Sequence, residues 1–179
     1  MSKLTTKLII AKSLEDLLKY QSINDITIDK IVNNVGLTRT TFYRHFIDKN
    51  DLVQWTYKYY VDRLIKLNNG INCWQTLTES VCNYIYMKKD FIYAICQYYG
   101  QNSFYNFLYN YSIEYLTQII QNDNIEITEQ LTKSIEFYVT GTIHIDYQWI
   151  SHNFRESPQM IASIICENVP LPLVSILLK

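Results

Sequence analysis

Apolar residues recur every three or four positions along nearly the whole chain, and only four glycines and three prolines interrupt the pattern. That spacing places the apolar side chains on one face of an α-helix. Sandwiches, barrels and glycine-loop nucleotide folds require many more turn residues than this chain contains. No segment shows the alternation typical of a β-strand with comparable clarity. The sequence therefore predicts an all-α fold of about nine helices.

The composition argues against several classes of protein. Of the 179 residues, 48% are hydrophobic and 18% are charged, so the chain can bury a core and is too short for a multi-lobed enzyme. Its four cysteines form no C-x-x-C pair, which is typical of reduced core residues. The sequence shows no secretion signal, no apolar run of membrane-spanning length and no nucleotide-hydrolysis, serine-hydrolase or zinc motif. We therefore expect a cytoplasmic protein with no membrane anchor, metal site or cofactor.

Charge is distributed unevenly along the chain. Residues 1–66 contain eleven Lys and Arg against seven Asp and Glu, a net charge of +4, whereas residues 67–179 contain five against ten, a net charge of −5. The turn-forming sequence Asn68-Asn69-Gly70 lies where the sign changes. We expect a domain boundary there. Because the N-terminal part is basic, we expect it to be the part that binds a polyanion.

Two short helices are predicted one after the other within the basic N-terminal part. Thr27 can cap the first, and Gly36 supplies the positive φ that ends it. Thr38 can cap the second, whose inner face carries Phe42 and Phe46. Two short helices joined at a glycine are typical of a helix-turn-helix, in which the second helix enters the major groove of DNA.

The second of these helices is predicted to direct polar and aromatic side chains outward. An ordinary helical hairpin with solvated side chains is the alternative interpretation. Solubility alone, however, explains poorly an exposed tyrosine and two arginines placed among core phenylalanines. The residues expected to face outward are Arg39, Thr40, Thr41, Tyr43 and Arg44.

The stretch from Ile26 to Phe46, followed by Asp48-Lys49-Asn50-Asp51-Leu52, resembles the DNA-binding domain of the TetR (tetracycline-repressor-like) family of bacterial regulators. Its F-Y-x-H-F-x-D-K-x-D-L core is much more specific than a generic helix-turn-helix, and the resemblance covers roughly the first third of the chain. The R-x-T-F-Y-x-H-F motif and the segment from Trp149 to Pro158 most resemble the sequences of the regulators associated with dihydroxyacetone kinase. The resemblance implies a DNA-binding domain over residues 1–48, a connecting helix over 49–67 and an effector-binding and dimerisation domain over 68–179.

The resemblance also implies roles for individual residues toward a double-stranded DNA operator. Arg39 has the bidentate fork that suits guanine O6 and N7, and a threonine can contact a thymine methyl group. For His45, packing at the edge of the core and contact with a phosphate remain equal alternatives, and Asp29 is expected to complement the dipole of its helix rather than to contact DNA. Base contacts are implied for Arg39, Thr40, Thr41 and Tyr43, and phosphate contacts for Thr27, Thr38, Arg44, His45 and Lys49.

The remainder of the chain is predicted to be helical as well. In the family, helices five to seven enclose a small effector and helices eight and nine form the dimer interface. A helix that begins at Thr128 and runs through Trp149 is longer than a small domain needs, and the segment from Pro158 to Leu178 is strongly apolar. We expect these two segments to hold a homodimer. Pro170 and Pro172 are expected to end the ninth helix.

An effector pocket in this half would be aromatic and would prefer a neutral or weakly polar ligand, because few charged residues lie between Ile71 and Gln121. Core packing is the competing explanation for every candidate, since a helical core also requires aromatic residues. His144 and Asp146 are two positions apart on a helix and point in different directions, which argues against a shared metal ion. The candidate pocket residues are Tyr84, Phe91, Tyr98, Phe104, Phe107, Tyr111 and Trp149.

Three hypotheses from different classes follow from the sequence. The one that we favour is a homodimeric transcriptional regulator that binds a near-palindromic operator and responds to a small-molecule effector. The second is a protein–protein co-regulator of the same fold that pairs with a DNA-binding relative, against which the presence of Arg39, Tyr43 and Lys49 argues. The third is a small helical enzyme, for which the sequence offers no catalytic constellation.

Overall fold

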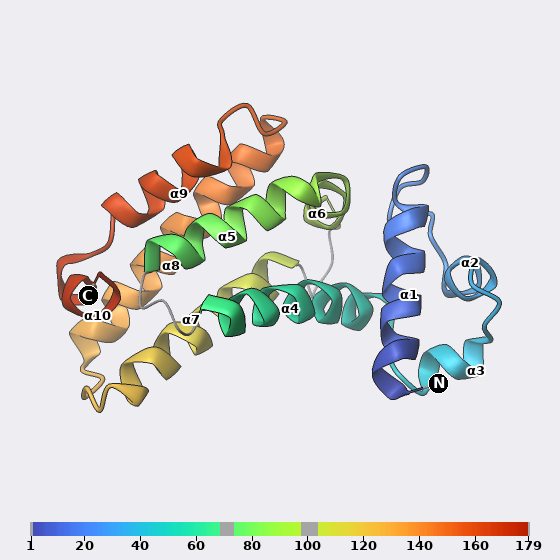
Figure 1. The fold of residues 1–179 in the computed structure, drawn as a ribbon, viewed down its shortest axis with the longest axis horizontal. Helices are drawn as coiled ribbons and strands as arrows, with labels where there is room; N and C mark the ends of the chain where they lie inside the picture. The colour runs from blue at the N-terminus through green and yellow to red at the C-terminus, as the bar shows by residue number, and fades with distance from the viewer. Residues whose placement is uncertain (1, 69–73, 98–103, 179) are drawn as a thin grey trace. The chain divides into compact units, whose positions relative to one another are not determined.

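The computed structural model describes residues 2–68, 74–97 and 104–178, which form ten α-helices and no β-strand (Figure 1). This confirms the predicted all-α fold. The expected break at Asn69-Gly70 and the pocket candidate Tyr98 lie outside the described residues. The helices are α1 (Lys3–Leu17), α2 (Ile28–Asn33), α3 (Arg39–Tyr43), α4 (Lys49–Asn68), α5 (Trp74–Met87), α6 (Lys89–Cys96), α7 (Phe104–Asn122), α8 (Glu129–Ser151), α9 (Pro158–Glu167) and α10 (Leu171–Leu177).

Four helices begin where the sequence predicts, because a side-chain hydroxyl caps each of them. Thr27 and Thr38 precede α2 and α3, and Thr128 and Ser157 precede α8 and α9. Each hydroxyl oxygen accepts a hydrogen bond from the backbone N–H three residues further on. Such a cap satisfies a donor that the first turn leaves without an intrahelical acceptor. Local sequence is therefore sufficient to start these helices.

The C-terminal end differs from the prediction. Pro170 and Pro172 follow the end of α9, as expected, but they also begin a tenth helix in place of the expected total of about nine. Proline is tolerated in the first turn because the N–H groups there have no intrahelical acceptor. Within the described ranges no single helix is long and apolar enough to cross a membrane. Only α9 and α10 together meet the length and composition required, and the chain bends by 117° between them.

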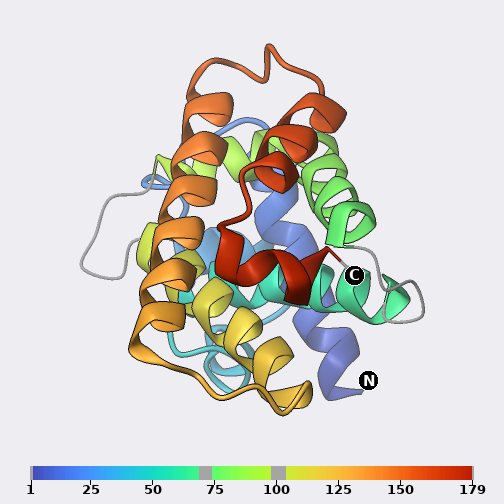
Figure 2. The ribbon, with the colours of Figure 1, turned by 90° about the vertical axis from the view of Figure 1, so that its left-hand side faces the viewer.

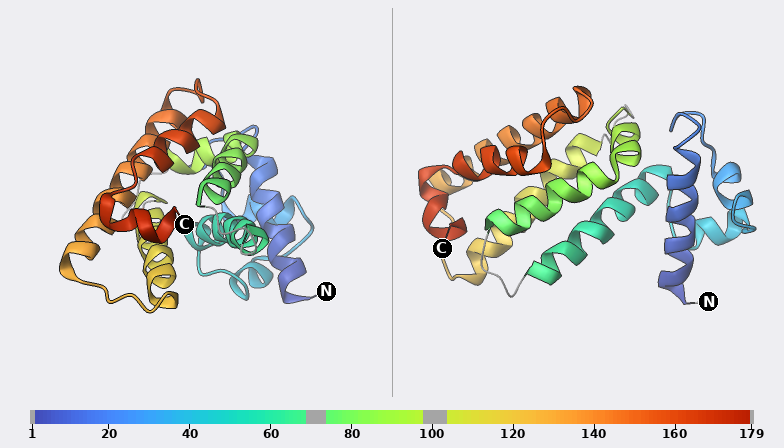
Figure 3. Two further views of the ribbon diagram at one scale, coloured as in Figure 1. Left: turned by 60° about the vertical axis from the view of Figure 1, so that its left-hand side comes forward. Right: turned by 45° about the horizontal axis from the view of Figure 1, so that its top comes forward.

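The chain divides into two compact units. The first contains residues 1–62 and 89–104, and the second contains residues 63–88 and 105–179. In the first unit, α1 packs beside α2 (Figure 3). The Ser13 hydroxyl on α1 donates a hydrogen bond to the Ile31 carbonyl oxygen of α2 (2.7 Å) and accepts one from Asn34 (3.1 Å). These bonds, together with the fully buried Leu14, hold the two helices in register.

The second unit is a bundle in which α5 lies alongside α9, and α8 contacts both α9 and α10 (Figure 2). One polar relay joins its helices. The Trp74 indole N–H of α5 donates to the Tyr138 hydroxyl of α8 (2.9 Å), and that hydroxyl donates to the Ile165 carbonyl oxygen of α9 (3.1 Å). Because the phenol is buried, satisfying both of its hydrogen-bonding roles removes a cost that burial would otherwise impose.

Candidate nucleic-acid interface

The segment from α2 to α3 has the geometry of a helix-turn-helix. Gly36 adopts a φ of +65° between the two helices, a conformation that glycine accepts without strain. The Leu37 N–H returns to the Val32 carbonyl oxygen (2.8 Å) and closes the turn. On the inner face of α3, Phe42 and Phe46 are buried with ring centroids 5.7 Å apart. The angle between the two helices is thus set by packing, as the sequence predicts.

The outer face of α3 is open to solvent. Arg39, Thr40 and Arg44 are exposed, Thr41 is partly exposed, and half of the Tyr43 side-chain surface is accessible. A tyrosine in this position has a ring edge and a hydroxyl available to another molecule. All the residues that the sequence assigns to base edges therefore lie on or beside one accessible surface of a short helix.

Arg39 does not extend freely from this surface. Its Nη1 donates to Oδ2 of Asp29 (2.7 Å), and its Nη2 donates to the Tyr43 hydroxyl (3.3 Å). The guanidinium carbon lies 5.8 Å from the centroid of the Tyr43 ring. Asp29 lies in the first turn of α2, as its expected dipole role requires. The ion pair with Arg39 is an additional contact that the sequence did not predict.

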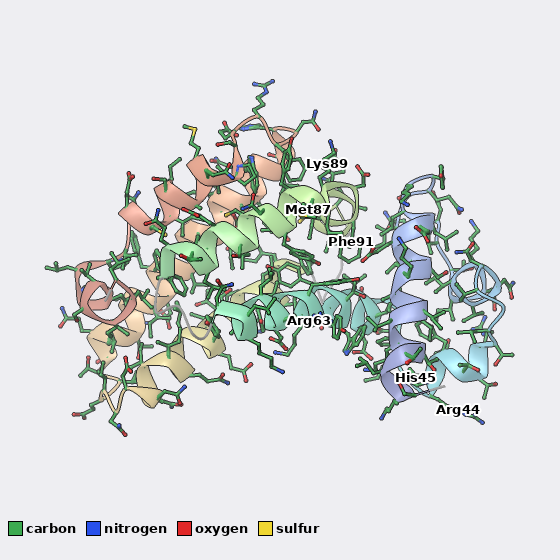
Figure 4. The ribbon with its side chains drawn as sticks, viewed as in Figure 1. Arg44, His45, Arg63, Met87, Lys89 and Phe91 are labelled. Carbon is green, nitrogen blue, oxygen red and sulfur yellow. The ribbon has the colours of Figure 1, made fainter. Side chains whose placement is uncertain are left out.

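A basic cluster, formed by Lys3, Lys7, Arg44 and His45, joins the start of α1 to the end of α3. Figure 4 shows Arg44 and His45 together at that end of α3. Burial lowers the pKa of His45, and the charges of Lys3, Lys7 and Arg44 lower it further. Within the described part of the chain, Nδ1 of His45 is buried and has no hydrogen-bond partner. A site with several cations and an imidazole is suited to a phosphate oxygen.

Lys7 has a second set of contacts that fixes the direction of its side chain. Its ammonium nitrogen lies 4.7 Å from the ring centroid of Phe46 and 4.9 Å from that of Trp55. Contact with two aromatic faces stabilises a cation at the surface. Lys3 and Lys7 were not among the predicted site residues, although their spacing of four residues on a helix already places both on one face.

Lys49, for which the family resemblance implies a phosphate contact, also makes hydrogen bonds within the chain. Its ammonium group donates to the carbonyl oxygens of Ile23 and Ile26, the latter at 2.9 Å. Partial burial lowers the pKa of Lys49, and the charge of Asp25 opposes this effect. The side chain therefore fastens the loop before α2 to the start of α4, a structural role that the sequence did not reveal.

One comparison with known proteins gives a family match over the C-terminal part of the chain. A family model described as "Transcriptional regulator C-terminal region" (TetR_C_8) matches residues 72–170, which is more than half of the chain. The chain belongs to the TetR family of transcriptional regulators. This confirms the family resemblance carried by the N-terminal motif, and it places the chain among regulators rather than enzymes.

Two similar proteins bear the same name. The "HTH-type dhaKLM operon transcriptional activator DhaS" of Lactococcus lactis subsp. lactis (strain IL1403) is 30% identical over 70 residues, which cover 39% of this chain and 37% of the activator. A solved structure of "Dihydroxyacetone kinase operon activator DhaS", 21% identical, matches with a TM-score of 0.71 over 97% of both chains and shows the shared fold. The chain is thus similar to two proteins named for the dihydroxyacetone kinase operon, the subgroup that the N-terminal motif suggests.

The aromatic candidates for a TetR-type effector pocket fall into both compact units. Phe91 and Phe104 belong to the first unit, where Phe104 meets the ring of Tyr57 edge-on.

In the second unit, Phe107 and Tyr111 stack with centroids 5.9 Å apart. Tyr84 is buried, and Trp149 is buried against Tyr86 and Phe154 while its indole N–H donates to the Glu156 carbonyl oxygen (2.9 Å). Core packing thus accounts for Trp149.

A buried carboxyl group in the second unit was not anticipated. Oδ1 of Asp146 is buried and, within the described residues, has no hydrogen-bond partner. Burial raises the pKa of Asp146 to about 7. Its charge acts on the Cys82 thiol of α5 and on the Tyr138 hydroxyl. His144, two residues earlier, is exposed, so the two side chains point in different directions as expected.

Proposed function

We propose that the chain binds a near-palindromic double-stranded DNA operator as a homodimer, and that a small-molecule effector changes its affinity for that operator. The observation that carries the proposal is the helix-turn-helix whose outer face presents Arg39 and Tyr43 next to the basic cluster. A rigid helix with an arginine fork suits base edges in the major groove, and the flanking cations suit the backbone. A regulator acting in this way works in the cytoplasm, where the chromosome of a bacterium lies.

The structure supports a refined assignment of the contacts. The hydroxyls of Thr27 and Thr38 accept capping hydrogen bonds and still carry a proton that can be donated to a phosphate oxygen. Lys49 is assigned to the support of the loop before α2. We place base contacts at Arg39, Thr40, Thr41 and Tyr43, and phosphate contacts at Thr27, Thr38, Arg44, His45, Lys3 and Lys7.

Replacing Arg39 by alanine is expected to weaken operator binding by about 1–3 kcal/mol and to relax the preference at one base pair, because the guanidinium fork is lost. The measurement is selection from a randomised duplex library, followed by affinity titration of the selected site at several salt concentrations. Arg155, an exposed arginine between α8 and α9, provides the matched control, and Arg155→Ala should leave binding unchanged. Equal loss of affinity for every duplex would contradict the base contact.

The same experiment separates the proposal from the co-regulator alternative. Several phosphate contacts per protomer predict that affinity falls steeply as the salt concentration rises, with a log–log slope of about −0.9 per contact. A wild-type protein that selects no duplex at low salt would refute direct DNA binding. That result would favour the alternative in which the protein acts by pairing with a DNA-binding relative.

The outward face of α8 supports the homodimer. Phe137 is 75% exposed, and the exposed Gly141 lies four residues further along the same face. A Cβ added at Gly141 would meet nothing within 4 Å, so packing within this chain does not require a glycine there. Glycine inside a helix costs roughly 1 kcal/mol relative to alanine, and close approach of a second backbone is a reason to keep it. On α9, Met160 is 53% exposed.

A bulky side chain at Gly141 tests this interface. Gly141→Leu is expected to raise the thermal stability of the monomer, because leucine favours the helix, but to disrupt the dimer by blocking close approach. Analytical ultracentrifugation over a concentration series measures the dimer, and Gly141→Ala is the control that adds only a methyl group. A wild-type protein that is monomeric at about 50 µM would exclude a stable homodimer, since obligate interfaces bind far more tightly than that.

The effector proposal is supported by polar and aromatic groups within the second unit. Within the described residues, the buried Oδ1 of Asp146 has no hydrogen-bond partner, which adds a specific anchor to the neutral, aromatic pocket that the sequence predicts. The helix α4 contributes residues to both units, so a ligand that shifts α4 can change the DNA-binding part. Such coupling requires the ligand to bind the free and operator-bound proteins with different affinities, typically by about 1–3 kcal/mol.

A further inference from the structure

The side chain of Asp29 forms an ion pair on the very surface that is proposed to meet DNA. Its Oδ2 lies 2.7 Å from Nη1 of Arg39, and the side chains of the two residues are 52% and 56% exposed. Asp29 belongs to α2 and Arg39 is the first residue of α3, so this contact links the supporting helix to the recognition helix. A negative charge in this position repels a phosphate backbone, and its presence therefore requires a reason other than affinity.

The geometry around Arg39 supplies that reason. Asp29 holds Nη1 from one side, and the Tyr43 hydroxyl accepts from Nη2 on the other. A guanidinium has five N–H donors, so these two contacts leave donors for a base edge. An arginine side chain loses rotamer freedom when it is ordered, and an arginine already ordered in the free protein avoids part of that cost on binding.

We propose that Asp29 is a specificity-determining residue with two effects. It positions the Arg39 guanidinium for one base pair, and it lowers the affinity for DNA in which no base accepts a hydrogen bond from Arg39. The second effect follows from charge. When Arg39 binds a guanine, the base satisfies its remaining donors while Asp29 keeps its own partner. On unrelated DNA, the phosphates repel the Asp29 carboxylate, and no contact between Arg39 and a base compensates for this repulsion. Asp29 therefore lowers affinity for unrelated DNA and raises discrimination at the operator. This inference rests on the proposed DNA binding through Arg39.

The test compares wild type, Asp29→Asn and Asp16→Asn with duplexes that vary at the base pair read by Arg39. Asp16 is the matched control, because it is also an exposed aspartate paired with lysines in the first unit. In Asp29→Asn, discrimination at that base pair should fall about five- to tenfold, and affinity for an unrelated duplex should rise about two- to threefold. Asp16→Asn should leave the discrimination unchanged.

A fall in discrimination together with a rise in affinity for the unrelated duplex distinguishes a positioning role from a general structural role. A variant in which α2 is merely weakened would lose affinity for every duplex alike, and that result would overturn the proposal. Unchanged discrimination in Asp29→Asn would also overturn it. Asp29→Glu, which keeps both the charge and the dipole interaction of α2, should recover part of the discrimination. A wild-type protein that selects no duplex gives a different result, because it removes the proposed DNA binding itself.

Discussion

The free energy of unfolding is expected to fall by up to about 4 kcal/mol through Asp146 alone as the pH rises from 4 to 8. The pKa of this carboxyl is raised by burial from 3.8 to about 7 in the folded protein. The folded state therefore holds the proton more tightly than the unfolded chain does. The stabilising contribution is fully present below the unfolded pKa and is lost as the pH rises through the folded one.

Chemical denaturation of wild type and Asp146→Asn at pH 4, 6 and 8 measures this effect. Asparagine cannot ionise, so the unfolding free energy of the variant relative to wild type should increase with pH by up to about 4 kcal/mol. Titrations common to both proteins cancel in this difference. Glu126→Gln, which removes an exposed carboxylate from the loop before α8, is the control and should give a difference that is small at each pH. Parallel stability curves for wild type and Asp146→Asn would contradict the burial of an ionising group.

Replacing Lys49 by methionine is expected to destabilise the first compact unit by about 1.5–3 kcal/mol while leaving the salt dependence of DNA binding unchanged. Methionine keeps the apolar stem but removes the ammonium group from the carbonyl oxygens of Ile23 and Ile26. Carbonyl groups that lose a charged donor retain the cost of their desolvation. Denaturant unfolding measures the stability, and titration of the operator at several salt concentrations measures the slope.

The salt slope decides between the two roles of Lys49. If its ammonium group neutralised a phosphate, as the family resemblance implies, Lys49→Met would make the log–log slope shallower by about 0.9. A structural role predicts the wild-type slope, together with lower stability. Lys12→Met removes a cation from an exposed ion pair on α1, and it should change the stability by no more than about 1 kcal/mol. A normal stability with a shallower slope would restore the phosphate contact.

The DNA-binding proposal and the two stability experiments are connected through the first unit. A loss of operator binding in any variant is interpretable only when the helix-turn-helix remains folded. The Arg39, Asp29 and Lys49 variants should therefore be compared at temperatures well below their unfolding transitions, where each variant is almost fully folded. Under that condition, changes in base preference report on contacts with DNA rather than on the population of folded protein.

Much of the helix-turn-helix could be predicted from sequence, because the decisive interactions are local. Thr27 and Thr38 cap helices through N–H groups three residues away, and Gly36 adopts the positive φ that its position in the turn requires. The burial of Phe42 beside the exposed Tyr43 follows from helical periodicity alone. Hydrophobic spacing also identified nine of the ten helices that the described residues form, whereas α10 was missed because two prolines were interpreted only as signals that end a helix.

The sequence by itself thus determined the all-α fold, the helix starts and the outward face of α3. Only the tertiary structure decided which distant groups meet. The Arg39–Asp29 pair spans 10 residues, and the Lys49 hydrogen bonds to the loop span 23 and 26. Asp146 likewise interacts with a group distant in the sequence, because its charge acts on the Cys82 thiol of α5. Periodicity states which face of a helix is apolar, but the partner of a charged side chain is set by the packing of whole helices, which no local pattern encodes.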